Sequence, residues 1–116
     1  MNAYSRAERV GGLIQQTVSE ILFKQVKDPR LEMATITHVK MTRDLKIARI
    51  YFVVPGGDQK AATATEGFQS AAGYLKRALS ERLDLRYMPK LEFYYDESFD
   101  YGSNIEKLLN AIRTES

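Results

Sequence analysis

The residues best suited to bind phosphate lie in a helical run over residues 61–85. Lys76 and Arg77 follow the small residues Ser70-Ala71-Ala72-Gly73. Cationic side chains neutralise phosphate and small residues allow close backbone approach, so this pattern indicates a clamp on a nucleic-acid backbone. Gly73 costs about 1 kcal/mol relative to alanine inside a helix, and we expect two helices that meet at a kink there. The spacing alone favours a simpler interpretation, in which Gly73 only relieves crowding between packed helices.

The sequence contains no arrangement typical of a catalytic or metal site. His38 is the single histidine, and the chain has no cysteine with which it could bind zinc. Asp96, Glu97 and Asp100 are clustered, but they lack the spacing of a calcium loop, which favours a solvated acidic loop. No Walker loop, dinucleotide fingerprint or serine-hydrolase elbow occurs. We therefore expect a protein that is not an enzyme and that uses no metal or cofactor.

Aromatic residues are concentrated in two predicted strands. If exposed, they could stack on RNA bases. The alternation of a strand places at least half of them in the core, which favours packing as their main role. The residues concerned are Tyr51, Phe52, Phe93, Tyr94 and Tyr95.

Charge is divided unevenly along the chain, although the net charge is only +2. Residues 40–90 hold ten basic and five acidic side chains, whereas residues 91–116 hold two basic and six acidic ones. A basic middle segment is typical of a protein with a phosphate-rich partner, and the acidic end indicates a solvated face or a second surface. The lack of cysteine and of a membrane-spanning apolar run predicts a soluble, cytoplasmic protein with no membrane partner.

The first helix should cover residues 6–25. It begins at a capping box formed by Ser5 and Glu8, and Pro29 must follow its end because proline lacks an amide proton. Gly11-Gly12 weakens this helix and marks either close packing or a frayed first turn. The helix therefore must end before Pro29 and is weakened near its beginning.

Three strands should follow, within an α+β fold. Residues 34–42 and 46–54 form a hairpin with a bulge near His38, and residues 90–96 form the third strand. A last helix should begin at a second capping box at Ser103. The expected order is helix, strand, strand, kinked helix pair, strand, helix. It gives a three-stranded sheet with helices on one face and strand order 2-1-3.

Several short blocks of sequence occur in a characteristic order along nearly the whole chain. They are Lys27-Asp28-Pro29-Arg30-Leu31, Thr42-Arg43-Asp44-Leu45, Ala71-Ala72-Gly73, residues 82–93 and Asp96-Glu97-Ser98. With these blocks the chain resembles the ribosome-binding factor A family of bacterial small-subunit assembly factors. It departs from the family at Glu32, where glycine is common, and at Gly11-Gly12.

The resemblance implies a single type-II KH-like domain over residues 1–116. The Gly-x-x-Gly loop usual in KH domains is replaced by an Ala-x-Gly kink at Ala71-Ala72-Gly73. The resemblance also implies that the protein binds the small ribosomal subunit, contacts its ribosomal RNA and assists late maturation of that RNA. A role in cold adaptation and the absence of catalysis are further implications, and we expect a monomer.

On such a fold we expect electrostatic docking followed by recognition of RNA shape. Seven basic side chains would neutralise phosphates, and two small residues would allow close RNA approach: Arg43, Lys46, Lys76, Arg77, Arg82, Arg86 and Lys90, with Ala72 and Gly73. One alternative is a KH-like protein that binds another structured RNA. A second is a protein-interaction module that uses the acidic final helix and the tyrosine-rich strand.

Overall fold

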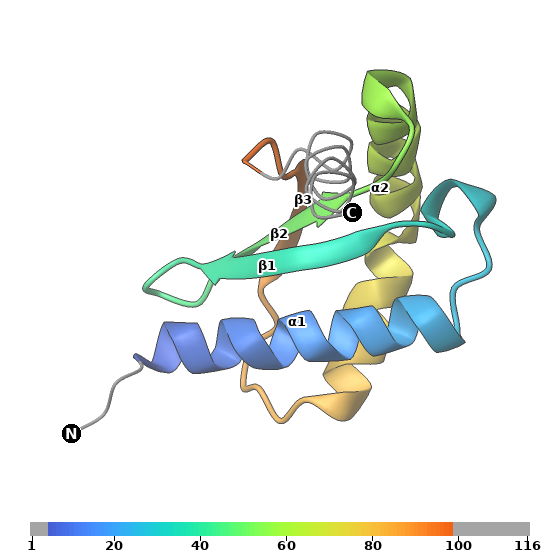
Figure 1. The fold of residues 1–116 in the computed structure, drawn as a ribbon. Helices are drawn as coiled ribbons and strands as arrows, with labels where there is room; N and C mark the ends of the chain where they lie inside the picture. The colour runs from blue at the N-terminus through green and yellow to red at the C-terminus, as the bar shows by residue number, and fades with distance from the viewer. Residues whose placement is uncertain (1–4, 99–116) are drawn as a thin grey trace, which may run out of the picture.

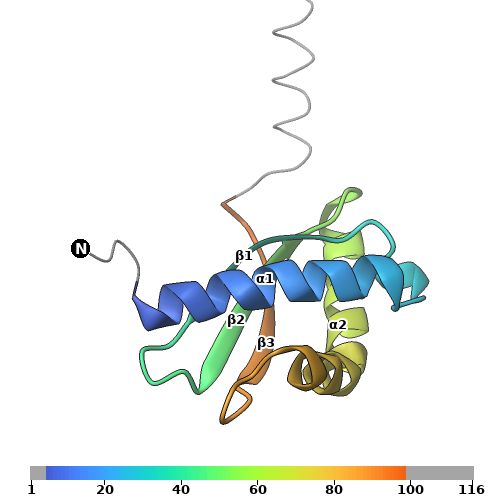
Figure 2. The ribbon, with the colours of Figure 1, turned by 90° about the horizontal axis from the view of Figure 1, so that it is seen from below.

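The computed structural model describes residues 5–98. Its elements are α1 Arg6–Lys24, the short 3-10 helix η1 Pro29–Leu31, β1 Thr35–Met41, β2 Ile47–Val53, α2 Gly57–Arg82 and β3 Lys90–Tyr95. Figure 1 shows the two long helices packed against one three-stranded sheet, and Figure 2 shows α1 running across the strands. The α+β expectation is therefore confirmed. The predicted last helix lies outside the described residues.

Helix α1 packs closely against the sheet through Gly11. The Ser5 hydroxyl caps the helix by accepting a 3.2 Å hydrogen bond from the Glu8 amide, as the capping box predicts. Gly11 is buried, and a Cβ atom built on it would lie 2.9 Å from the backbone oxygen of Val39 in β1. Gly12 is exposed, with nothing within 4 Å of such an atom. Close packing is therefore the correct interpretation for Gly11.

The strand order is β1-β2-β3, so the predicted order 2-1-3 is wrong. β2 pairs with β1 antiparallel and with β3 parallel. None of the side chains of β2 is exposed, as expected for a central strand. The short hairpin turn joins β1 to one edge of β2, and α2 then carries the chain to its other edge. The bulge near His38 is confirmed, because the register shifts between Ile36 and His38.

Three phenylalanines form the centre of the core between the sheet and α2. Phe68 of α2 is fully buried, with its ring 4.6 Å from Phe52 and 4.9 Å from Phe93. The intervening strand residues Tyr51 and Tyr94 pack against each other with their rings 5.6 Å apart. Strand alternation thus divides the aromatic residues as predicted, with phenylalanine in the core.

Helix α2 is continuous from Gly57 to Arg82, which corrects the expectation of two helices meeting at Gly73. Phe68 precedes Gly73 and Leu75 and Leu79 follow it, and all three side chains are fully buried. Burying each large apolar side chain contributes about 1.5–3 kcal/mol, which exceeds the cost of one helical glycine. In Figure 1 the axis of α2 changes direction near its middle. The helix therefore bends without a break.

Candidate nucleic-acid interface

Four of the predicted RNA-binding residues are brought together at the β1–β2 turn and the segment that enters β3. We call Arg43, Lys46, Arg86 and Lys90 the hairpin group. The backbone amide of Lys90 donates a 2.8 Å hydrogen bond to the backbone oxygen of Lys46, which joins the two segments. All four side chains are exposed. Residues about forty positions apart in the sequence thus form one basic surface.

The turn that carries Arg43 and Lys46 is held in shape by its own polar groups. Asp44 accepts hydrogen bonds from the Thr42 hydroxyl at 2.7 Å and from the Lys46 amide at 3.1 Å. These hydrogen bonds hold the pKa of Asp44 below its usual value, with that of Thr42 the larger cause. Leu45 adopts a left-handed backbone conformation, with φ of 61°, which a branched side chain rarely does. The turn is therefore braced and locally strained.

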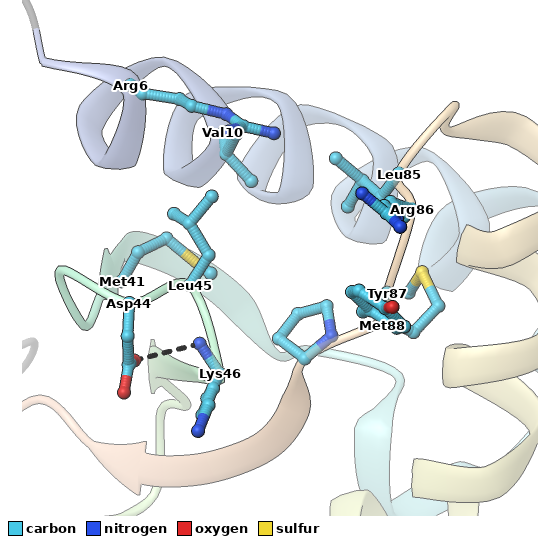
Figure 3. A pocket seen from close by; sticks show the side chains of 11 residues that line it. Arg6, Val10, Met41, Asp44, Leu45, Lys46, Leu85, Arg86, Tyr87 and Met88 are labelled. Carbon is cyan, nitrogen blue, oxygen red and sulfur yellow. Dashed lines mark hydrogen bonds between the residues drawn. The ribbon is translucent and has the colours of Figure 1, made fainter.

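A pocket of about 530 Å³ lies between this turn, the start of α1 and residues 85–89 (Figure 3). Lys46 and Arg86 of the hairpin group line it, and Arg6 at the start of α1 joins them. From the sequence, Arg6 is predicted only to begin a helix. Its basic character was visible in the sequence, but only the packing of α1 beside the hairpin brings it to this surface.

A second set of predicted residues lies on α2. Gly73, Lys76 and Arg77 are exposed and share one helix face, because residues three and four apart are neighbours on a helix. Lys76 and Arg77 form no ion pair within residues 5–98. Ala72 is half-buried and packs against the core. We call Gly73, Lys76 and Arg77 the helix group.

Arg82 has a structural contact with α1 that its sequence context does not predict. One guanidinium nitrogen, Nη1, lies 3.5 Å from Oε2 of Glu20 on α1. This ion pair joins the end of α2 to α1 and engages part of the charge that was expected to bind phosphate. Arg82 is thus less available to a partner than Lys76 or Arg77.

The expectation that Asp96 belongs to a solvated acidic loop is wrong, because this carboxylate is buried, whereas the neighbouring Glu97 is exposed. Asp96 is only 6% exposed and accepts hydrogen bonds from the hydroxyls of Thr37 at 2.6 Å and Ser98 at 2.5 Å. These bonds, that of Ser98 first, hold the pKa of Asp96 below its usual value. His38 Nδ1 lies 3.4 Å from the same carboxylate, and the His38 ring stacks on Tyr51. The network links the strand β1 to the segment after β3.

Two negative findings apply to the described part of the chain. Within residues 5–98, no group of three or more His, Cys, Asp or Glu side chains is placed to hold a metal ion. Over the same residues, no helix is both long and apolar enough to cross a bilayer.

Comparisons with known proteins agree with this architecture. A family model described as ribosome-binding factor A matches residues 6–109. The chain is 54% identical over 112 residues to a ribosome-binding factor A of Desulfatibacillum aliphaticivorans, covering 97% of this chain and 91% of that protein. A solution structure of a putative ribosome binding factor A of Thermotoga maritima is 25% identical, with a TM-score of 0.73 and coverage of 86% of this chain and 95% of that one.

A further similar fold is a homology model of Thermus thermophilus ribosome binding factor A that was fitted into the cryo-EM map of a 30S complex. It is 22% identical, with a TM-score of 0.67 and coverage of 80% of this chain and 98% of that one. At this identity the likeness concerns the fold alone. The family match and the sequence relative together show that this chain belongs to the ribosome-binding factor A family.

Proposed function

We propose that this chain is an assembly factor of the small ribosomal subunit, which binds the subunit through its ribosomal RNA and assists late maturation of that RNA without catalysing a reaction. Family membership carries the proposal. The 30S complex into which a protein of the same fold has been fitted supports the choice of subunit. The chain would act as one KH-like domain over residues 1–116, as a monomer in the cytoplasm, and contribute to growth in the cold.

The hairpin group and the helix group support RNA as the contacted component. Both present exposed cations, and phosphate contacts position a protein on RNA without reading its sequence. Specificity would then come from the folded shape of the ribosomal RNA. A rigid turn and a continuous helix are suited to this role, because they present the charges in a fixed arrangement.

The direct test is sedimentation of the purified, tagged protein with ribosomal particles at several salt concentrations. We expect it to travel with small subunits and to dissociate as salt rises. Equal binding to large subunits or to free structured RNA would favour a general KH-like RNA-binding protein. Nuclease-insensitive association with a protein partner would favour an interaction module instead.

The helix group gives a quantitative prediction. Replacing both Lys76 and Arg77 with alanine should make the slope of log affinity against log salt concentration shallower by about 1.5. Each phosphate contact contributes roughly 0.7–0.9 to the magnitude of this slope. Lys60→Ala, at an exposed lysine in the first turn of the same helix, is the control and should leave the slope unchanged. The measurement is the slope of log affinity against log salt. A double variant with the wild-type slope would remove these two residues from the interface.

Gly73→Ala should separate stability from binding. An added methyl meets nothing within 4 Å and the backbone is not left-handed, so we expect the free energy of unfolding to rise by up to about 1 kcal/mol. If RNA lies against Gly73, small-subunit association should nevertheless weaken. Gly12→Ala, at another exposed helical glycine with open space, should raise stability and leave association unchanged. Raised stability with normal sedimentation of Gly73→Ala would show that RNA does not approach this residue.

A further inference from the structure

The pocket between the hairpin turn, α1 and residues 85–89 combines an apolar floor with a cationic rim (Figure 3). Its volume of about 530 Å³ lies within the range of sites that hold small organic groups. Val10, Met41 and Pro89 are buried and form part of its lining. The pocket can therefore remove a flat, mostly apolar group from water.

The strained turn contributes one wall of this pocket. Leu45, in its left-handed conformation, directs its side chain toward Val10 on α1, as Figure 3 shows. A leucine in this conformation is strained, and such strain concentrates at binding sites. The hydrogen bonds of Asp44 to Thr42 and Lys46 maintain the turn. The strained turn thus places an apolar side chain in the wall of the pocket, close to its basic residues.

The charges around the pocket favour an anionic ligand. Arg6, Lys46 and Arg86 line it, and none of them forms an ion pair with another described side chain. Asp44 is the one carboxylate in the lining, and one of its oxygens accepts the hydrogen bonds that brace the turn. The balance of charge therefore suits a phosphate group at the rim.

An exposed aromatic ring completes the set of contacts that a nucleotide needs. Tyr87 is 77% exposed, and the guanidinium carbon of Arg86 lies 5.5 Å from the centre of its ring. A tyrosine ring and a guanidinium plane are both surfaces on which RNA bases stack. A peptide of acidic residues alone would satisfy the cations, but it would have no flat ring to place against these planes.

We propose that this pocket holds one nucleotide of unpaired RNA, with its base against the apolar lining and Tyr87, and its phosphate beside Arg6, Lys46 and Arg86. The proposal rests on the proposed function, because it takes the nucleotide to be part of the RNA that the protein binds. Phosphate contacts elsewhere would position the protein on the RNA. This pocket would require one unpaired nucleotide at a fixed point of the bound RNA. It would thereby distinguish single-stranded segments from duplex.

Two methionines make the pocket observable by NMR. Met41 and Met88 line it, whereas Met33 is 64% exposed elsewhere and serves as an internal reference. In protein labelled at the methionine methyl groups with carbon-13, a single-stranded adenosine decamer of RNA should shift the Met41 and Met88 signals saturably and leave Met33 in place. Tyr87→Ala should weaken this binding roughly tenfold, because stacking on one aromatic side chain is worth that order of affinity.

Two further variants keep the test independent of folding. Leu45→Asn removes the apolar wall with a residue that tolerates the left-handed conformation, so RNA binding should weaken while the melting temperature is kept. Phe23→Ala truncates an aromatic side chain that is 90% exposed and lies outside the pocket, and it should change nothing. Wild-type affinity of both the Tyr87→Ala and Leu45→Asn variants would overturn the proposal.

Other ligands distinguish the source of the nucleotide. Saturation of the same shifts by AMP at the concentrations that suffice for the decamer would identify a site for free nucleotides and overturn the RNA assignment. Equal shifts from a glutamate decamer would mean that only charge is recognised, which would also overturn it. Unchanged methyl signals with RNA, in a protein that still sediments with small subunits, would refute the pocket and leave the proposed function standing. Methyl shifts with RNA, in a protein that does not sediment with small subunits, would support the pocket and refute the proposed function.

Discussion

Gly11→Val is expected to lower the free energy of unfolding by about 3 kcal/mol, the upper end of the range for an overpacked core. The gap between α1 and β1 is already too short for a Cβ atom, which would lie 2.9 Å from the Val39 backbone oxygen and 3.5 Å from Cγ of Met41. Valine adds two further methyl groups in this gap. The obstructing atom belongs to the backbone of a paired strand, so it cannot rotate away, and the helix must move off the sheet.

The neighbouring glycine provides the control for this prediction. Gly12→Val places the same side chain on the same helix, but with nothing within 4 Å of its Cβ atom, so stability should change by no more than about 0.5 kcal/mol. Gly11→Ala should fall between the two, because better helix propensity offsets part of the clash. Urea unfolding of the three variants measures the series. Equal midpoints for the valine variants at 11 and 12 would show that α1 is not seated on β1 through Gly11.

Asp96→Ala is expected to lower the free energy of unfolding by about 2–3 kcal/mol at neutral pH. Hydrogen bonds to a charged group are worth about 1.5–3 kcal/mol each, and this nearly buried carboxylate accepts bonds from the Thr37 and Ser98 hydroxyls and from the Ser98 amide. We place the total below the sum of three such bonds, because the exposed Ser98 can bond to water instead and Thr37 also has the Tyr51 backbone oxygen as an acceptor at 3.3 Å. The loss should appear as a lower urea midpoint.

The same residue predicts how stability depends on pH. The pKa of Asp96 is lowered on folding, so its stabilising contribution is fully present above the pKa of the unfolded chain, about 3.9, and is lost as pH falls through the lower folded value. The difference in stability between wild type and Asp96→Ala should thus be constant above about pH 5 and shrink below pH 4. Glu97→Ala, at the exposed carboxylate next along the chain, is the control. A difference independent of pH down to pH 2 would mean that the Asp96 charge does not contribute.

Features set by neighbouring residues were predictable from the sequence. The Ser5 cap, the end of α1 before Pro29, the three strands and the bulge before His38 all follow from turn chemistry and strand alternation, and the structure has each of them. The two glycines of α1 show the limit of local reasoning. Their sequence context is nearly identical, yet only Gly11 faces the backbone of β1.

Features set by packing between distant segments were not predictable. The order of the strands depends on which edge of β2 receives β3, and the continuity of α2 depends on core contacts on both sides of Gly73. Arg6 joins Lys46 and Arg86, and Thr37 meets Asp96, only through the tertiary fold. For the interface, the sequence indicated the basic residues, and the structure gathers them into the hairpin and helix groups. Their contacts with RNA stay predictions.

The parallel pairing of β2 with β3 constrains the order in which the chain can fold during its own synthesis. β1 and β2 meet across the short turn from Thr42 to Ile47, whereas β3 reaches β2 only after the whole of α2 has been made. A chain arrested before Lys90 therefore carries an unpaired strand edge beside the apolar side chains of Ile50 and Phe52. Such edges are templates for pairing with other chains. Addition of the third strand closes that edge, so the step that completes the sheet also protects its most apolar strand from pairing with other chains.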